Sequence, residues 1–171
     1  MGAKGAKGDG VAPLTTKIHT PLSLYTLSSL APLGRPTAWD VDGTPVPQGS
    51  LRPYMAGGRP VLVYSNREPL AMWRDAVRDA CPITEPALGP CGVHMRFRIQ
   101  RPRGHYAKDG SILPRFVDAM PCTRPDIDKL ARAILDALTM RVWRDDAQVV
   151  DMHATLRYAD TPGVTVLVSR A

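Results

Sequence analysis

The sequence predicts a mixed α/β (α+β) domain in which a small mixed β-sheet carries two main helices and ends in an antiparallel hairpin. Apolar and polar residues alternate over residues 93–99 and again over residues 150–158, as in half-buried strands. Apolar residues recur at helical spacing over residues 69–80 and 127–140. Residues 161–168 contain a Thr-Pro-Gly turn followed by an apolar run, which predicts a returning strand.

The first part of the chain divides into a leader and the start of this domain. Residues 1–35 are rich in Gly, Pro, Ser, Thr and Leu without steady periodicity, which predicts a flexible N-terminal leader. Residues 36–171 are then expected to form one domain. Thr37 to Gly43 is the first expected strand, and Val61 to Tyr64 the second, separated by a loop rich in proline and glycine.

The first helix and the strand after it are marked clearly. Pro69 suits the first turn of a helix, and Pro82 ends it. The strand at residues 93–99 has one apolar face and one polar face, the polar face carrying His94, Arg96 and Arg98. These arginines are candidates for contact with phosphates, and the alternative is an ordinary solvated outer face.

A long segment with little periodicity follows, from Gln100 to Arg124. Its cations and tyrosine suit contact with phosphates and an unstacked base, and the candidates are Arg101, Arg103, His105, Tyr106 and Lys108. The alternative is a disordered surface loop without function.

Charge and composition narrow the class of partner. The formal net charge is +6 and the pI is about 9.5, which favours a polyanion such as DNA, RNA or an anionic membrane surface. The three cysteines form no CxxC pair, which argues against both a disulfide framework and a zinc site. No apolar run is long enough to span a bilayer and the N-terminus lacks a secretory signal, so a cytoplasmic protein without membrane contact is expected.

Four aspartates flank the second helix. Asp126 and Asp128 open it, and Asp145 and Asp146 follow its end. One interpretation is that Asp126 is only the N-cap and that Asp128 complements the helix dipole. The other is that the fold brings both pairs together around Mg²⁺, which prefers carboxylate oxygens and water, with Mn²⁺ as a possible substitute. Spacing alone leaves both interpretations open.

The same region resembles a known family. The runs RPDIDKLARAILDALT (residues 124–139) and VWRDDAQVV (residues 142–150) are similar to the signature of RusA-like Holliday junction resolvases. Weaker likeness lies at residues 43–50, 73–77 and 101–106. The resemblance implies a RusA-like fold over residues 36–171.

The resemblance also implies roles for individual residues. Asp126, Asp128 and Asp146 match the family's catalytic metal-binding aspartates, and Asp145 lies where it can assist as a ligand. Arg132 stands where the family has a lysine, which makes it a candidate catalytic cation, and Lys129 replaces an asparagine. The cations expected to grip DNA are Arg96, Arg98, Arg101, Arg103, His105, Lys108, Lys129 and Arg132, together with Tyr106.

The implied activity is that of a Mg²⁺-dependent crossover junction endodeoxyribonuclease. Such a protein acts as a homodimer and resolves four-way DNA junctions by paired symmetric nicks during recombination and repair, in a bacterium, a phage or a prophage. Two alternatives remain open at this point. One is a related metal-dependent nuclease acting on flaps or forks, and the other is a basic DNA-binding protein without catalysis.

Overall fold

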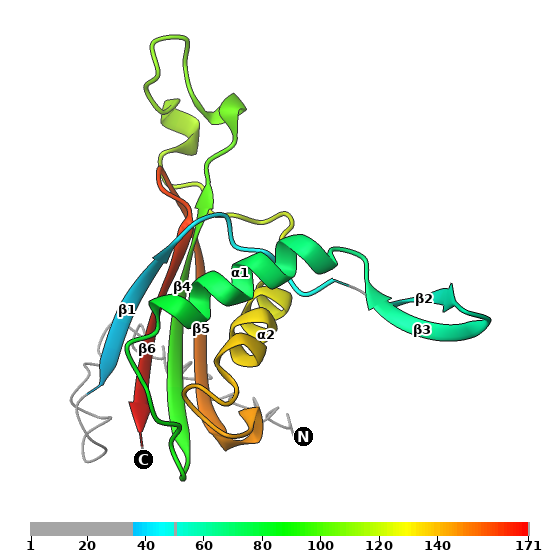
Figure 1. Cartoon of the computed structure of the whole chain (residues 1–171). Coiled ribbons are helices and arrows are strands. Elements are labelled where there is room, and N and C mark those ends of the chain that lie inside the picture. Colours follow the sequence, from blue (N-terminus) through cyan, green and yellow to red (C-terminus); the bar gives the residue numbers. More distant parts are fainter. Residues whose placement is uncertain (1–35, 50, 171) are drawn as a thin grey trace, which may run out of the picture.

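The computed structural model describes residues 36–49 and 51–170, so the predicted leader lies outside the described residues. The main elements follow the predicted order (Figure 1). They are β1 (Thr37–Asp42), β2 (Leu51–Ala56), β3 (Arg59–Tyr64), α1 (Arg67–Ala80), β4 (Cys91–Gln100), α2 (Ile127–Leu138), β5 (Val149–Ala159) and β6 (Gly163–Arg170).

The main sheet has the order β1-β6-β4-β5, with β4 and β5 parallel and the other pairs antiparallel, which confirms the mixed α+β class. The last two strands run in opposite directions, as predicted. They do not pair with each other, however, because β4 lies between them. The connection between Ala159 and Gly163 has to cross two strand spacings, about 10 Å. Three connecting residues, fully extended, are long enough to do this.

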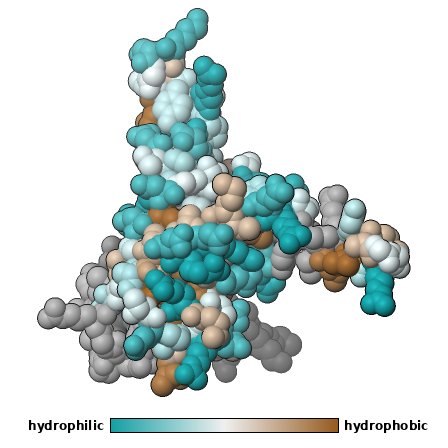
Figure 2. All heavy atoms as spheres, viewed as in Figure 1, coloured by the Kyte–Doolittle hydropathy of each residue, from teal (hydrophilic) through white to brown (hydrophobic). Residues whose placement is uncertain are grey.

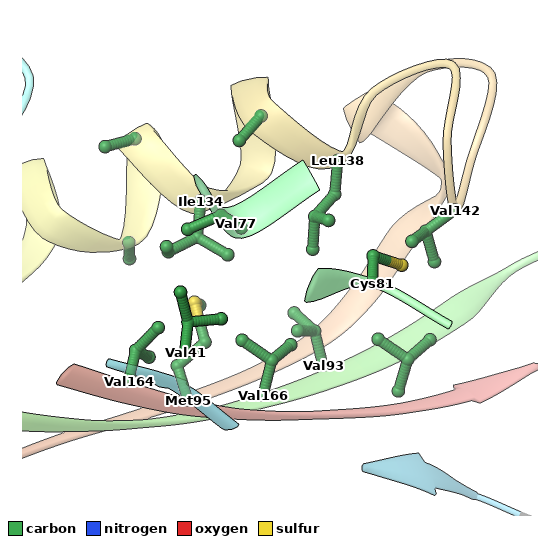
Figure 3. Close-up of a cluster of buried hydrophobic side chains, with 14 of the residues drawn as sticks. Val41, Val77, Cys81, Val93, Met95, Ile134, Leu138, Val142, Val164 and Val166 are labelled. Carbon is green, nitrogen blue, oxygen red and sulfur yellow. The ribbon is translucent and has the colours of Figure 1, made fainter. Parts of the chain in front are cut away.

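Both helices cover one face of the sheet (Figure 1). The α2 helix buries a stripe of apolar side chains: Leu130, Ala131, Ala133, Ile134, Ala137 and Leu138. Figure 3 shows Ile134 and Leu138 facing Val93, Met95 and Val166 of the sheet. An ion pair between Arg74 of α1 and Asp136 joins the helices at the partly exposed rim of this core.

The α2 helix ends two residues earlier than the sequence predicts. Thr139, its C-cap, is outside the helical region, and Met140 has a positive φ of 65°. The Met140 backbone N–H donates to the carbonyl of Trp143 at 2.6 Å, and Trp143 is fully buried. The tertiary position of this tryptophan therefore sets the helix end, although no glycine marks it in the sequence.

The edge strand β5 is less buried than its alternation predicts. Val150 and Met152, assigned to the apolar face, are 73% and 51% exposed. A bulge lies beside them, since Cys91 pairs with Val149 and Gly92 with Asp151, leaving Val150 without a partner in the ladder. The helices do not extend over this end of the sheet (Figure 1).

Two projections extend from the body (Figure 1). The first is the hairpin of β2 and β3, called the arm below, which forms a separate two-stranded sheet. The second contains residues 101–120, and it has more order than its lack of periodicity predicts. The His105 ring stacks on Phe116 at 3.9 Å, and two short 3₁₀ turns, Arg103–His105 and Pro114–Phe116, shape the segment.

Candidate active site and DNA-binding surfaces

The first acidic pair lies at the N-terminal end of α2. Asp126 is the N-cap residue, but its side chain makes no capping hydrogen bond. Instead its Oδ2 accepts a hydrogen bond from Lys129 Nζ at 2.5 Å. The Lys129 ammonium lowers the pKa of the Asp126 carboxyl, by this hydrogen bond and by its charge, so the carboxylate stays ionised. The simple capping interpretation therefore does not account for the Asp126 side chain.

Asp128 and Arg132 lie one turn apart on the exposed face of α2. Neither side chain forms an ion pair or hydrogen bond with another of the described residues. The carboxylate and the guanidinium are both open to solvent at the same helix face. An anionic ligand with a bound cation could therefore contact both.

The second acidic pair lies in the turn before β5, in the 3₁₀ helix Asp146–Gln148. Asp145 caps this turn, because its side chain accepts from the backbone N–H of Ala147 at 2.8 Å. The Gln148 side chain completes a capping box and donates to the carbonyls of Ala87 and Gly89. The Asp145 side chain thus has a structural role. Asp146 is exposed and has no hydrogen-bond or ion-pair partner among the described residues.

Within one chain, the structure does not bring the two acidic pairs together. The twelve residues of α2 separate the pairs by about 18 Å. Asp126 and Leu156 of β5 line the same cleft. Asp146 lies just before Val149, the first residue of β5, and Val149 is about 23 Å from Leu156 along that strand. Among residues 36–49 and 51–170, no group of three or more Asp, Glu, His or Cys residues lies close enough to hold a metal. The helix that carries the first pair holds the second pair at its other end.

The predicted cations of β4 lie on the sheet face opposite to α2. Arg98 is held there by Asp40 and Asp42, at 2.7 and 2.8 Å, and by the Thr165 hydroxyl at 2.9 Å. The Thr165 hydroxyl and the Arg98 guanidinium lower the pKa of Asp40. Arg98 is therefore largely neutralised, whereas Arg96 is exposed beside a hollow that also contacts His94 and His153.

The predicted cations of the second projection have two different roles. Arg101 donates to the carbonyl of Phe116 at 2.6 Å and lies over the Tyr158 ring, so it stabilises the base of the projection together with His105. The Tyr106 hydroxyl lies 3.4 Å from an Asp160 oxygen. Arg103 and Lys108 are exposed. These last two are the cations of the predicted set that the projection leaves open to phosphates.

Sequence reasoning missed the arm as a candidate functional element. It found only Val61 to Tyr64 and assigned that strand no role. The signal was present, because Gly57 and Gly58 both have positive φ and form the two-residue turn that Gly-Gly favours in hairpins. The other strand of the arm, β2, was not predicted because its apolar residues occupy both faces and do not alternate with polar ones.

Exposed cations that can hold a phosphate backbone, and exposed carboxylates that can bind a metal, are features that this α+β domain shares with nucleases. The family model Endodeoxyribonuclease RusA matches residues 42–169, most of the chain, which therefore belongs to the RusA endodeoxyribonuclease family. This confirms the resemblance found in the sequence.

A curated relative was also found. The uncharacterized protein YqaN of Bacillus subtilis (strain 168) is 38% identical over 48 residues, which cover 28% of this chain. The match spans 34% of that protein's own length. Within the described part of this chain, no helix has the length and apolar character needed to cross a membrane.

Proposed function

We propose that this RusA-family nuclease is a Mg²⁺-dependent resolvase that cuts four-way DNA junctions by paired symmetric nicks during recombination and repair. The observation that carries the proposal is the family match, because it spans both acidic pairs and the helix between them. The exposed carboxylates of Asp128 and Asp146, without partners among the described residues, are consistent with ligands that await a metal. Arg132 lies one turn from Asp128 and would hold the scissile phosphate.

The donor set fits Mg²⁺. This ion keeps several waters and commonly takes one or two carboxylates, so Asp126 and Asp128 supply a partial set. A bound Mg²⁺ would supply an activated water and neutralise charge on the phosphate. Lys129 competes for Asp126 in the free protein, so its ammonium must turn away when a cation arrives. The displaced ammonium would then reach a DNA phosphate near the same helix end.

A homodimer would explain why the two acidic pairs are apart. A two-fold axis across α2 reverses the helix in the second copy. That operation would bring Asp126 and Asp128 of one protomer beside Asp146 of the partner subunit, and it would create two equivalent sites. A nearly two-fold junction has two equivalent strands to cut, so the symmetry of the enzyme would match that of its substrate.

Asp128→Asn tests the catalytic assignment. The change removes a metal ligand and leaves the cations in place, so cleavage of a mobile four-way junction should fall to background while junction binding persists. Asp79→Asn, an exposed aspartate of α1, is the matched control and should behave like wild type. Near wild-type turnover by Asp128→Asn at saturating Mg²⁺ would disprove the assignment.

Mixing two inactive variants tests the shared site. In a mixed dimer of Asp128→Asn and Asp146→Asn protomers, a site built across two chains would be intact once and doubly defective once. One nick per junction should therefore return after mixing. If each site lay within one chain, both would be defective and no activity would return.

Substrate comparison separates the alternatives. A resolvase should cut the mobile four-way junction symmetrically and leave flaps, forks and linear duplex largely uncut. Equal cutting of flaps or forks would favour the related nuclease. Binding of all these DNAs without any cutting would favour a non-catalytic protein. In every case binding should fall steeply with salt, because cations on the protein displace counterions from DNA.

A further inference from the structure

The arm (residues 51–64) is an apolar projection, and the other described residues leave its residues 53–62 exposed. In the register of its two strands, Tyr54 lies opposite Val61, and Met55 lies opposite Pro60. Opposite residues share a face, so each face of the arm carries large apolar side chains. Tyr54, Met55 and Leu62 are 64%, 62% and 63% exposed. Figure 2 shows brown and pale atoms on this projection, with teal atoms at its lower side.

Such exposure needs an explanation. An isolated two-stranded hairpin is marginally stable in water. Contiguous exposed apolar surface on a soluble protein usually marks an interaction site. The arm makes its strand pairing within itself and none with the main sheet. Its exposed apolar side chains therefore indicate a binding partner other than the described residues of this chain.

The edges of the arm disfavour another β-strand as that partner. Pro53 lies in β2 and Pro60 lies in β3, so each strand lacks one backbone N–H. In a paired hairpin, proline is tolerated only where the missing N–H would point outward. Both outer edges therefore lack a donor that strand addition by a second chain would need.

The charge of the arm favours DNA. Residues 51–64 contain Arg52 and Arg59 and no acidic residue. Arg59 is exposed beside the turn, and Gly57 and Gly58 add no side chains there, which keeps the tip narrow. An apolar surface next to a cation suits bases next to phosphates. Apart from its two arginines and the hydroxyls of its two tyrosines, the arm has no polar side chain that could read base edges in a groove, so stacking is the main interaction that its chemistry supports.

We propose that the arm is a wedge that enters the branch point of a four-way junction and stacks Tyr54, Met55 and Leu62 on the bases exposed there. Apolar side chains inserted between bases offset the cost of unstacking in other DNA-binding proteins. At a branch point the continuous stack is already interrupted, so that cost is smaller than in duplex. This inference rests on the proposed junction activity. It gives the arm a role in selecting junctions, separate from the aspartates.

The test uses full-length protein with Ca²⁺ in place of Mg²⁺ and a synthetic four-way junction with 2-aminopurine at the branch point. A linear duplex with the same label is the second DNA. Wild type should raise the fluorescence of the junction only. Tyr54→Ser/Met55→Ser/Leu62→Ser should lose that rise and bind the junction about tenfold more weakly or worse, with duplex affinity unchanged. Met72→Ser, a 74% exposed residue of α1, is the matched control.

Three outcomes would overturn the wedge. The first is a triple variant that opens the junction as wild type does. The second is equal loss of duplex and junction binding, which indicates a general DNA contact. The third is a difference in oligomeric state, in which wild type sediments as a dimer and the triple variant as a monomer. That result would make the arm a contact between copies. Failure of the proposed function looks different, because wild type itself would then not prefer the junction or cut it with Mg²⁺.

Discussion

The substitution Gly163→Ala examines how closely the edge of the sheet is packed around Arg98. Gly163 begins β6, where it lies opposite Asp42 of β1 and Arg98 of β4. A Cβ atom there would lie 2.4 Å from the Val41 carbonyl oxygen and 2.5 Å from Arg98 Nη2. The Val41 oxygen belongs to a neighbouring strand and cannot rotate away. An alanine must therefore shift β1 and push the guanidinium from its carboxylates.

Opposing effects set the size of the change. Overpacking of this kind costs about 1–3 kcal/mol. Loss of the Arg98 pairs adds about 0.2–1 kcal/mol each, since their carboxylates are largely exposed and screened. Alanine lowers the entropy of the unfolded chain and returns about 0.4–1 kcal/mol. The steric term dominates, and we expect a net destabilisation of about 2 kcal/mol, which lowers Tm by about 4–8 °C in a chain of this size.

Urea unfolding followed by circular dichroism measures this change. Gly104→Ala is the matched control, because a Cβ there meets nothing within 4 Å. It should leave the unfolding free energy unchanged or slightly raised. In an Arg98→Ala background, Gly163→Ala should cost less, since one of its two contacts is gone. If the unfolding free energy of Gly163→Ala lies within about 0.5 kcal/mol of the wild-type value, the close packing of Val41 and Arg98 around Gly163 is disproved.

Two further changes test other parts of the structure. Gln148→Leu removes the side chain that joins the Asp145 turn to Ala87 and Gly89, and takes one amide donor from each of these two carbonyls. Thermal melting should show a loss of about 1–3 kcal/mol, and the outcome against this is a Tm equal to that of wild type. The lowered pKa of Asp40, caused by the Thr165 hydroxyl and then by Arg98, predicts that its carboxylate adds stability above the ordinary aspartate pKa near 3.9. This stability, below about 1 kcal/mol for so exposed a group, is lost as pH falls through the lowered pKa. Urea midpoints of wild type and Asp40→Asn should therefore differ at pH 6 and converge near pH 2–3, whereas an equal difference at both pH values would contradict the assignment.

The sequence predicts the elements that bury one face. Both helices and the strands β1, β4 and β6 follow from the spacing of apolar residues, since burial against one layer imposes that spacing. Strand order is a different matter. The insertion of β4 between β5 and β6 depends on which apolar faces fit together across the sheet, and alternation within one strand carries no information on its neighbours.

For the candidate site, too, the sequence indicates residue types but not the distances between them. The sequence identifies the aspartates by type and by family likeness, but the distance between Asp126 and Asp146 depends on the direction of α2 relative to the chain after it. The cations were also predicted by type. Arg98 and Arg101 prove to be held by Asp40 and by the Phe116 carbonyl, contacts between residues far apart in sequence. Arg103 and Lys108 have no such partner among the described residues and remain candidates for DNA contact.

The α2 helix connects the stability of the domain to the geometry of the proposed sites. Its buried stripe fixes the helix on the sheet, and the same twelve residues hold Asp128 and Asp146 at opposite ends. In the proposed dimer, the separation of the two sites is therefore set by the helix length. One inserted residue would turn everything beyond it by about 100° and take Ile134 or Leu138 out of the core. In that dimer the spacing of the cuts could change only at the expense of the core, so a rigid, buried helix would suit the proposed cutting of two strands at matched positions.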